Sequence, residues 1–67
     1  MSWTIRKLTK DGTYIFKHNK PDKNAIDDVH KWNTNNINNV SPFDTEFDAK
    51  NRLSKFKYPS GWEIIEI

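Results

Sequence analysis

Two histidines and a pair of adjacent aspartates are the residues of this chain with the clearest means for metal chemistry. A site built on His18 and His30 would need one or two further ligands, and the nearby carboxylates are those of Asp27 and Asp28. His30 lies four residues from Ile26 rather than from a second ligand, so the helical spacing provides no ligand pair. We therefore expect both histidines to lie on the surface, and we predict no metal site.

The other reactive side chains also lack a pattern typical of catalysis. General acid–base chemistry needs carboxylates in a cleft that shifts their pKa values, whereas Asp44, Glu46 and Asp48 are better explained as charge at a helix N-terminus. None of the serines stands in a nucleophile-elbow context, and two glycines are too few for a phosphate-binding loop. Without cysteine there is no thiol nucleophile, disulfide or zinc–thiolate site. The sequence predicts a protein that is not an enzyme and takes no cofactor.

An aromatic pair on a predicted helix gives the first candidate binding surface. At 100° per residue, a helix over 46–57 places Phe47 and Tyr58 on the side opposite Ala49. Exposed aromatic residues with polar neighbours are typical anchors of protein interfaces. In the alternative, Phe47 folds back over Phe43 and Tyr58 covers a sheet edge. The predicted partner-binding residues are Phe47, Lys50, Asn51, Ser54, Lys55 and Tyr58.

A basic hairpin gives the second candidate surface, for nucleic acid. Residues 1–23 hold six basic and two acidic side chains, whereas residues 24–49 hold one basic and five acidic ones, within a net charge of +2. A sheet face that combines basic and aromatic residues can stack bases or enter a groove. The alternative function is therefore a small DNA- or RNA-binding domain. Its predicted contact residues are Arg6, Lys7, Lys10, Tyr14 and Lys17.

These side chains must be positioned by a small sheet. Short apolar stretches on either side of Asp11-Gly12, a turn signal, predict a β-hairpin over about residues 2–8 and 13–18. The run WEIIEI predicts a further strand over 62–67 that pairs with the hairpin. If this strand lies at the sheet edge, it can recruit a partner by strand addition. A third alternative for the function is a small structural or assembly subunit that forms a homo-oligomer through this strand.

Two helices are predicted from apolar spacing. Ala25, Val29 and Trp32 form one helical stripe, which predicts a short helix over about 24–32 with Asn24 as its cap. Ile26 lies beside that stripe.

The second helix is predicted over about 46–57, with Ala49, Leu53 and Phe56 on its buried side. Thr45 and the acidic residue three positions later resemble a capping box. Pro59 and the glycine that follows supply the end of the helix. The five asparagines within 33–39 predict a loop between the two helices.

Together these elements predict a single α+β domain over residues 1–67, with a three-stranded antiparallel sheet, one main helix on one face and a shorter helix, in the order ββ(α)αβ. We expect no transmembrane helix and no secretory signal, because the chain has no long apolar run and no apolar leader. The lack of cysteine suits a reducing cytosol. The expected core is Trp3, Ile5, Ile15, Ala49, Leu53, Phe56, Ile64 and part of Trp62.

Residues 43–67, FDTEFDAKNRLSKFKYPSGWEIIEI, follow the hairpin with one helix and a final strand. This order resembles small bacteriophage host-takeover proteins, such as the phage inhibitor of bacterial RNA polymerase. The chain differs from them by its extra segment 19–42 and its mildly basic charge. The resemblance implies an inhibitor in the host cytoplasm, as a monomer or weak homodimer, that occludes a host or defence protein such as a nucleic-acid enzyme.

A weaker resemblance is to three-stranded-sheet DNA-binding domains of the integrase-arm and ethylene-response type. It rests on the Lys10-Asp11-Gly12 turn and on the spacing of Phe43, Thr45 and Ala49 at a helix start. This pattern is largely a capping pattern followed by a close-packing alanine. The resemblance implies nucleic acid as the partner.

Overall fold

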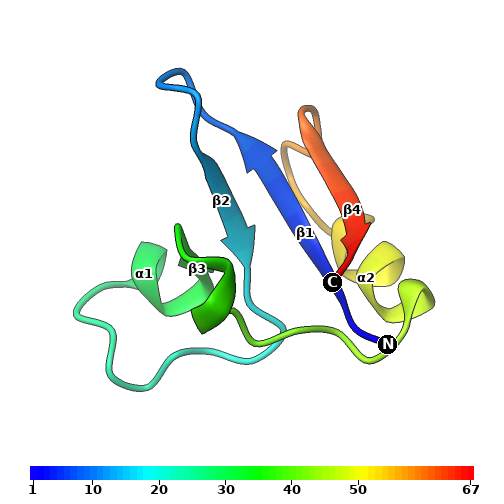
Figure 1. The fold of residues 1–67 in the computed structure, drawn as a ribbon, viewed down its shortest axis with the longest axis horizontal. Helices are drawn as coiled ribbons and strands as arrows, with labels where there is room; N and C mark the ends of the chain where they lie inside the picture. The colour runs from blue at the N-terminus through cyan, green and yellow to red at the C-terminus, as the bar shows by residue number, and fades with distance from the viewer.

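A four-stranded antiparallel sheet forms the centre of the computed structural model, which describes all 67 residues (Figure 1). The strand order is β3-β2-β1-β4, so β3 and β4 are the two edges. The predicted α+β class is confirmed, whereas the predicted number of three strands is wrong. The strands are β1 (Trp3–Leu8), β2 (Tyr14–Lys17), β3 (Asn33–Thr34) and β4 (Trp62–Glu66).

The predicted hairpin is present as β1 and β2, with Ile5 opposite Lys17 in the register. Its turn depends on Gly12, whose φ of 89° lies in the region that favours glycine. The Asp11 carboxylate accepts hydrogen bonds from the Thr13 backbone at 3.2 Å and from the Thr9 and Thr13 hydroxyls. These bonds, with that from Thr9 the strongest, hold the pKa of Asp11 below its usual value.

The fourth strand, β3, comes from the segment predicted as a loop. Its residues Asn33 and Thr34 pair with Lys17 and Phe16 of β2, and the ladder begins where the His18 N–H donates to the Trp32 carbonyl at 2.8 Å. Asparagine has low strand propensity, so this pairing is imposed by the neighbouring strand and not by local preference. The rest of the loop includes a short 3-10 helix, η1 (Ile37–Asn39).

The first helix, α1, spans only Asp28–Trp32, so the predicted helix over 24–32 is too long. The Asp27 side chain caps it by accepting from the His30 N–H at 2.8 Å, and the predicted cap, Asn24, belongs instead to a preceding turn closed by Asp22. The predicted buried stripe is also wrong, because α1 contains no buried residue.

The second helix, α2, spans Glu46–Leu53 and begins at the predicted cap, where the Thr45 hydroxyl accepts from the Asp48 N–H at 3.0 Å. It ends four residues before the predicted end at 57. Beyond Leu53 the backbone hydrogen bonds join residues three apart instead of four, as in a 3-10 helix. The Phe56 N–H, for example, donates to the Leu53 carbonyl at 3.1 Å. This tightening accompanies the edge-on packing of Phe56 against Trp62, with ring centroids 5.4 Å apart.

The core lies between α2 and one face of β1 and β4. Ile5, Phe43 and Ala49 are its fully buried members, and most of the other predicted core residues pack against them. Ile15 is a wrong prediction, because it lies outside this cluster. Phe43 was missed, and it is held in place by two backbone bonds with Trp3, at 2.9 and 2.7 Å.

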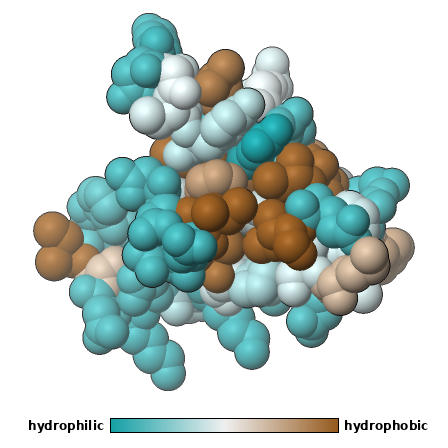
Figure 2. Space-filling view, viewed as in Figure 1, coloured by the Kyte–Doolittle hydropathy of each residue, from teal (hydrophilic) through white to brown (hydrophobic).

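The opposite face of the sheet carries no helix. In Figure 1, α2 lies behind β1 and β4, and the helix-free face points toward the viewer. Strand alternation places Thr4 and Arg6 of β1 on this face, and the register adds Phe16 of β2 and Ile65 of β4. Thr4 and Phe16 are nevertheless buried. In Figure 2, the same view, apolar residues gather over the sheet and hydrophilic residues surround them.

Candidate binding surfaces

The outer side of α2 carries four of the six predicted partner-binding residues on one stripe. Phe47, Asn51 and Ser54, the C-cap residue, lie four and three residues apart. Lys50 lies three residues after Phe47 and four before Ser54, so all four are on the same side. Phe47 is 75% exposed, whereas Ala49 on the opposite side is fully buried. The alternative in which Phe47 folds back over the core is therefore wrong.

Polar contacts order this stripe around Phe47. The Lys50 ammonium pairs with the Glu46 carboxylate at 2.8 Å, and the Ser54 hydroxyl donates to the Asn51 carbonyl at 2.6 Å. Both contacts join neighbours on the helix surface. The stripe is thus an exposed aromatic ring with an ammonium, an amide and a hydroxyl beside it. We name Phe47, Lys50, Asn51 and Ser54 the α2 stripe.

Lys55 and Tyr58, the other two predicted partner-binding residues, lie beyond the end of α2. The predicted helical alignment of Tyr58 with Phe47 is therefore wrong. Tyr58 is 75% exposed, so it does not cover a sheet edge, and the Lys57 ammonium lies 5.6 Å from its ring centre. The segment after α2 thus presents a second exposed aromatic residue, in a position that helical geometry does not set.

The five residues predicted to bind nucleic acid do not form one surface. Arg6 and Tyr14 lie on the helix-free face, Lys10 lies in the hairpin turn, and Lys7 and Lys17 lie on the face that carries the core. Strand alternation is the cause, because the sequence mixes residues from both sides of each strand. The basic hairpin is therefore divided between two faces.

Arg6 is already engaged on the helix-free face. Its guanidinium lies 4.1 Å from the centre of the Tyr14 ring, and its Nε donates to the Glu63 carboxylate of β4 at 2.5 Å. The carboxylate neutralises the charge that would attract a phosphate. Arg6 and Tyr14 form a stacked pair with a flat aromatic surface.

The two lysines on the core face cover aromatic side chains. The Lys17 ammonium lies 5.1 Å from the Phe56 ring centre, and the Lys7 ammonium lies 6.0 Å from that of Trp62. Burial, together with the nearby Arg52 charge, lowers the pKa of Lys17 below its usual value. Both lysines pack their stems along the core edge.

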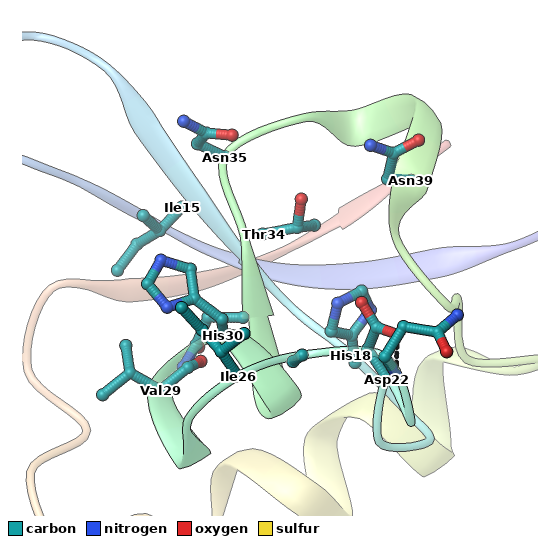
Figure 3. Close-up of a pocket in the computed structure, with 12 residues that line it drawn as sticks. Ile15, His18, Asp22, Ile26, Val29, His30, Thr34, Asn35 and Asn39 are labelled. Atoms are coloured by element: carbon teal, nitrogen blue, oxygen red, sulfur yellow. Dashed lines mark hydrogen bonds between the residues drawn. The ribbon is translucent and has the colours of Figure 1, made fainter.

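A hollow of about 640 Å³ lies beside β3 and was not predicted. Figure 3 shows His18 and Asp22 at one end and Ile26, Val29 and His30 at the other, with Thr34 of β3 between them. Ile26 and Val29 are 94% and 67% exposed. The signal that could have indicated this hollow is the run of asparagines, since amide side chains line much of it.

His18 was predicted to lie on the surface, and this prediction is wrong because its side chain is only 4% exposed. Its Nδ1 accepts a hydrogen bond from the Ser41 N–H at 3.0 Å, so a neutral ring carries its proton on Nε2. His18 thereby fastens the end of the 33–42 segment to β2.

His30 is exposed, as predicted, and its Nδ1 lies 2.8 Å from the Asp27 carboxylate. The backbone N–H of His30, followed by its ring, lowers the pKa of Asp27. Nowhere in the structure do three or more His, Asp or Glu side chains converge as metal ligands would. No helix has the length and apolar character needed to cross a membrane.

Comparisons with known proteins found no relative. No family model, curated protein or solved structure matches this chain.

Proposed function

We propose that this chain is a small non-enzymatic binding protein that engages another protein through the α2 stripe. The exposure of Phe47 carries this proposal, because Phe47 is 75% exposed on a helix whose opposite residue is fully buried. Burying a phenylalanine side chain contributes about 1.5–3 kcal/mol, which the isolated chain forgoes. In a domain with only six buried residues, that loss is best explained by burial in a complex.

The surroundings of Phe47 support a protein partner. Interfaces concentrate their affinity in a few aromatic or arginine anchors, with polar groups around them that exclude water. Lys50, Asn51 and Ser54 supply such polar groups along the same stripe. Tyr58 and Lys55 add a second exposed aromatic residue and a charge on the following segment.

We further propose that the partner is a host or defence protein that the chain occludes, as a phage or mobile-element inhibitor acting in the host cytoplasm. The small size of the chain and the resemblance of residues 43–67 to host-takeover proteins support this proposal. A nucleic-acid enzyme is the kind of target that the resemblance suggests.

The test is capture of the partner from a nuclease-treated bacterial lysate, with an untreated lysate beside it. We expect the tagged wild-type chain to retain one stoichiometric protein after nuclease treatment and at moderate salt. Phe47→Ala and Lys50→Glu should each abolish or strongly reduce this capture, with little change in melting temperature. Ile26→Ala is the matched control, because Ile26 is 94% exposed but lies beside the hollow.

Two results would contradict the assignment to α2. Capture that is lost with Ile26→Ala and kept with Phe47→Ala would move the contact to the hollow beside β3. Recovery of nucleic acid alone, lost after nuclease or at high salt, would instead favour the surface with Arg6 and Tyr14. Duplex DNA binding would then weaken linearly in log affinity against log salt, with a slope of about −0.9 per neutralised phosphate.

A further inference from the structure

The outer edge of β4 presents backbone groups without partners. β4 is the last strand of the sheet, and its only neighbour is β1. In an antiparallel pair, the backbone groups of successive residues point alternately toward the neighbour and away from it. Alternate residues of β4 therefore direct their N–H and C=O groups outward.

The bonds of Trp3 establish which residues these are. Trp3 exchanges both of its backbone bonds with Phe43, on the side of β1 that faces away from β4. Its β4 partner in the register, Glu66, is therefore in a non-hydrogen-bonded pair. By alternation, Ile64 and Trp62 also point outward, and the Ile67 N–H, which donates to the Ser2 carbonyl at 2.8 Å, points inward.

We propose that two copies of this chain associate through β4, antiparallel and around a two-fold axis at Ile64, to form one continuous eight-stranded sheet. The proposal goes beyond the proposed function, since it does not involve the α2 stripe. A two-fold axis brings the same strand of each copy together, so a single open edge is sufficient for both partners.

The charges on β4 select this register over its neighbours. An axis at Glu63 would set two glutamates directly opposite each other, which is destabilising. An axis at Ile65 creates no charge pairing. With the axis at Ile64, Glu66 of one copy lies opposite Trp62 of the other copy. Lys7 of that other copy pairs with the same Trp62 from the β1 side, so the three residues lie in one row across the strands.

Lys7 and Glu66 carry opposite charges. Neither forms an ion pair within the chain. Lys7 extends over Trp62, with its ammonium 6.0 Å from the ring centre and its stem beside Gly61. Lys7 is two strands away from Glu66 of the second copy, so their Cα atoms lie about 10 Å apart. Two extended side chains can span this distance. The two-fold axis gives two such pairs.

The backbone of Trp62 agrees with the same arrangement. Its N–H already donates to the Pro59 carbonyl at 3.2 Å, so only its carbonyl is free for a second copy. The dimer then has four intermolecular backbone bonds, two between the Ile64 residues and two from the Glu66 N–H to the Trp62 carbonyl. The other edge offers less, because β3 has two residues. An interface of this size gives a weak, concentration-dependent dimer.

The test is sedimentation equilibrium of the full chain from about 10 µM to about 1 mM, the range in which weak association is measured. We expect a monomer–dimer equilibrium. Lys7→Glu and Glu66→Lys should each raise the dissociation constant of the dimer by about 4- to 25-fold. Each change removes two exposed ion pairs, and each pair changes the constant by about 2- to 5-fold. The double variant Lys7→Glu/Glu66→Lys should restore association.

Glu66→Pro tests the backbone bonds separately, because it removes an outward N–H without removing a bond between β4 and β1. It should abolish the dimer while leaving the melting temperature within a few degrees of wild type. Lys57→Glu is the charge control and should change nothing. A wild-type chain that stays monomeric up to 1 mM would overturn the proposal. A dimer that Glu66→Pro and Glu66→Lys do not weaken would also overturn it, because that dimer would use another face.

Discussion

The two helices begin with the same kind of cap and differ in everything that follows. Asp27 and Thr45 each accept a hydrogen bond from the backbone N–H three residues later, at 2.8 and 3.0 Å. Yet α2 continues for eight residues and buries Ala49, whereas α1 has five residues and buries none. Capping thus decides where a helix begins, and packing against the sheet decides how far it extends.

The same difference separates two regions of the molecule. Residues 19–42 contain no buried residue, and every buried residue lies in β1, β2, α2 or directly beside them. In Figure 1, α1 lies beside the β3 edge of the sheet, and the chain after η1 runs back toward α2. The Arg52 guanidinium of α2 also donates to the Asn19 carbonyl at 3.3 Å. We expect the core region to hold most of the stability and the 19–42 segment to open locally at a low free-energy cost.

The largest effect should come from Phe43→Ala. This ring is 1% exposed, and its loss should lower the free energy of unfolding by about 3–5 kcal/mol, most of the stability of so small a domain. The matched change in the other region, Val29→Ala, should cost less than about 0.5 kcal/mol. Urea unfolding followed by tryptophan fluorescence measures both. Similar costs would remove the distinction between the regions.

The next largest difference should come from removing the two helix caps, which should affect the free energy of unfolding at α2 but not at α1. Thr45→Ala should lower the free energy of unfolding by about 1 kcal/mol, because α2 is part of the core. Asp27→Ala removes the same kind of bond but should leave the global unfolding midpoint unchanged and only speed hydrogen exchange of the α1 amides. A shift of the global midpoint by Asp27→Ala would show that α1 unfolds together with the core.

A smaller effect is expected at Lys17, which lies where the two regions meet, opposite Ile5 on one side and Asn33 on the other. Its pKa is lowered in the folded chain, so the fold disfavours the charge, and stability should rise as pH increases toward 10.5. Lys17→Met should raise the free energy of unfolding near pH 7 by a few tenths of a kcal/mol, since solvent screens most of the effect. A destabilised variant would mean that the contact with Phe56 outweighs the burial of the charge.

The smallest effect is a pH dependence confined to α1. The pKa of Asp27 lies below 3.8 in the folded chain, so the stability contributed by its charge is present at neutral pH and is lost as pH falls through the folded value. The His30 amide resonance should report this titration with a midpoint below 3.8, while core amides stay unchanged. In Asp27→Asn the titration should disappear, because asparagine keeps the cap without the charge.

Local signals in the sequence were sufficient for most elements of the core region. The turn at Gly12, the cap at Thr45 and the alternation in β4 predicted the hairpin, the start of α2 and the last strand. Each depends on residues close in sequence, whose backbone preferences act without help from the rest of the chain. The helical position of Phe47 relative to Ala49 favoured an exposed ring, but the sequence left open that the ring folds back over Phe43, and only the structure decided between the two.

The 19–42 segment was predicted less well, because its conformation depends on distant partners. β3 exists because β2 offers a free edge to Asn33 and Thr34, and His18 is buried because it accepts from Ser41, far along the chain. Ala25, Val29 and Trp32 have helical spacing, but the helix covers only part of this span and contains no buried residue. A periodic pattern predicts a helix without showing that a surface exists to bury it.

The sequence by itself determined the α+β class, the hairpin and the position of the cap of α2. The tertiary structure alone decided the fourth strand, the burial of Phe43 and the exposure of Phe47. The physical reason is the distance along the chain over which each interaction acts. Turns and caps are closed by bonds between residues a few positions apart, whereas strand order, burial and the sharing of a face arise only when distant segments meet and exclude water together.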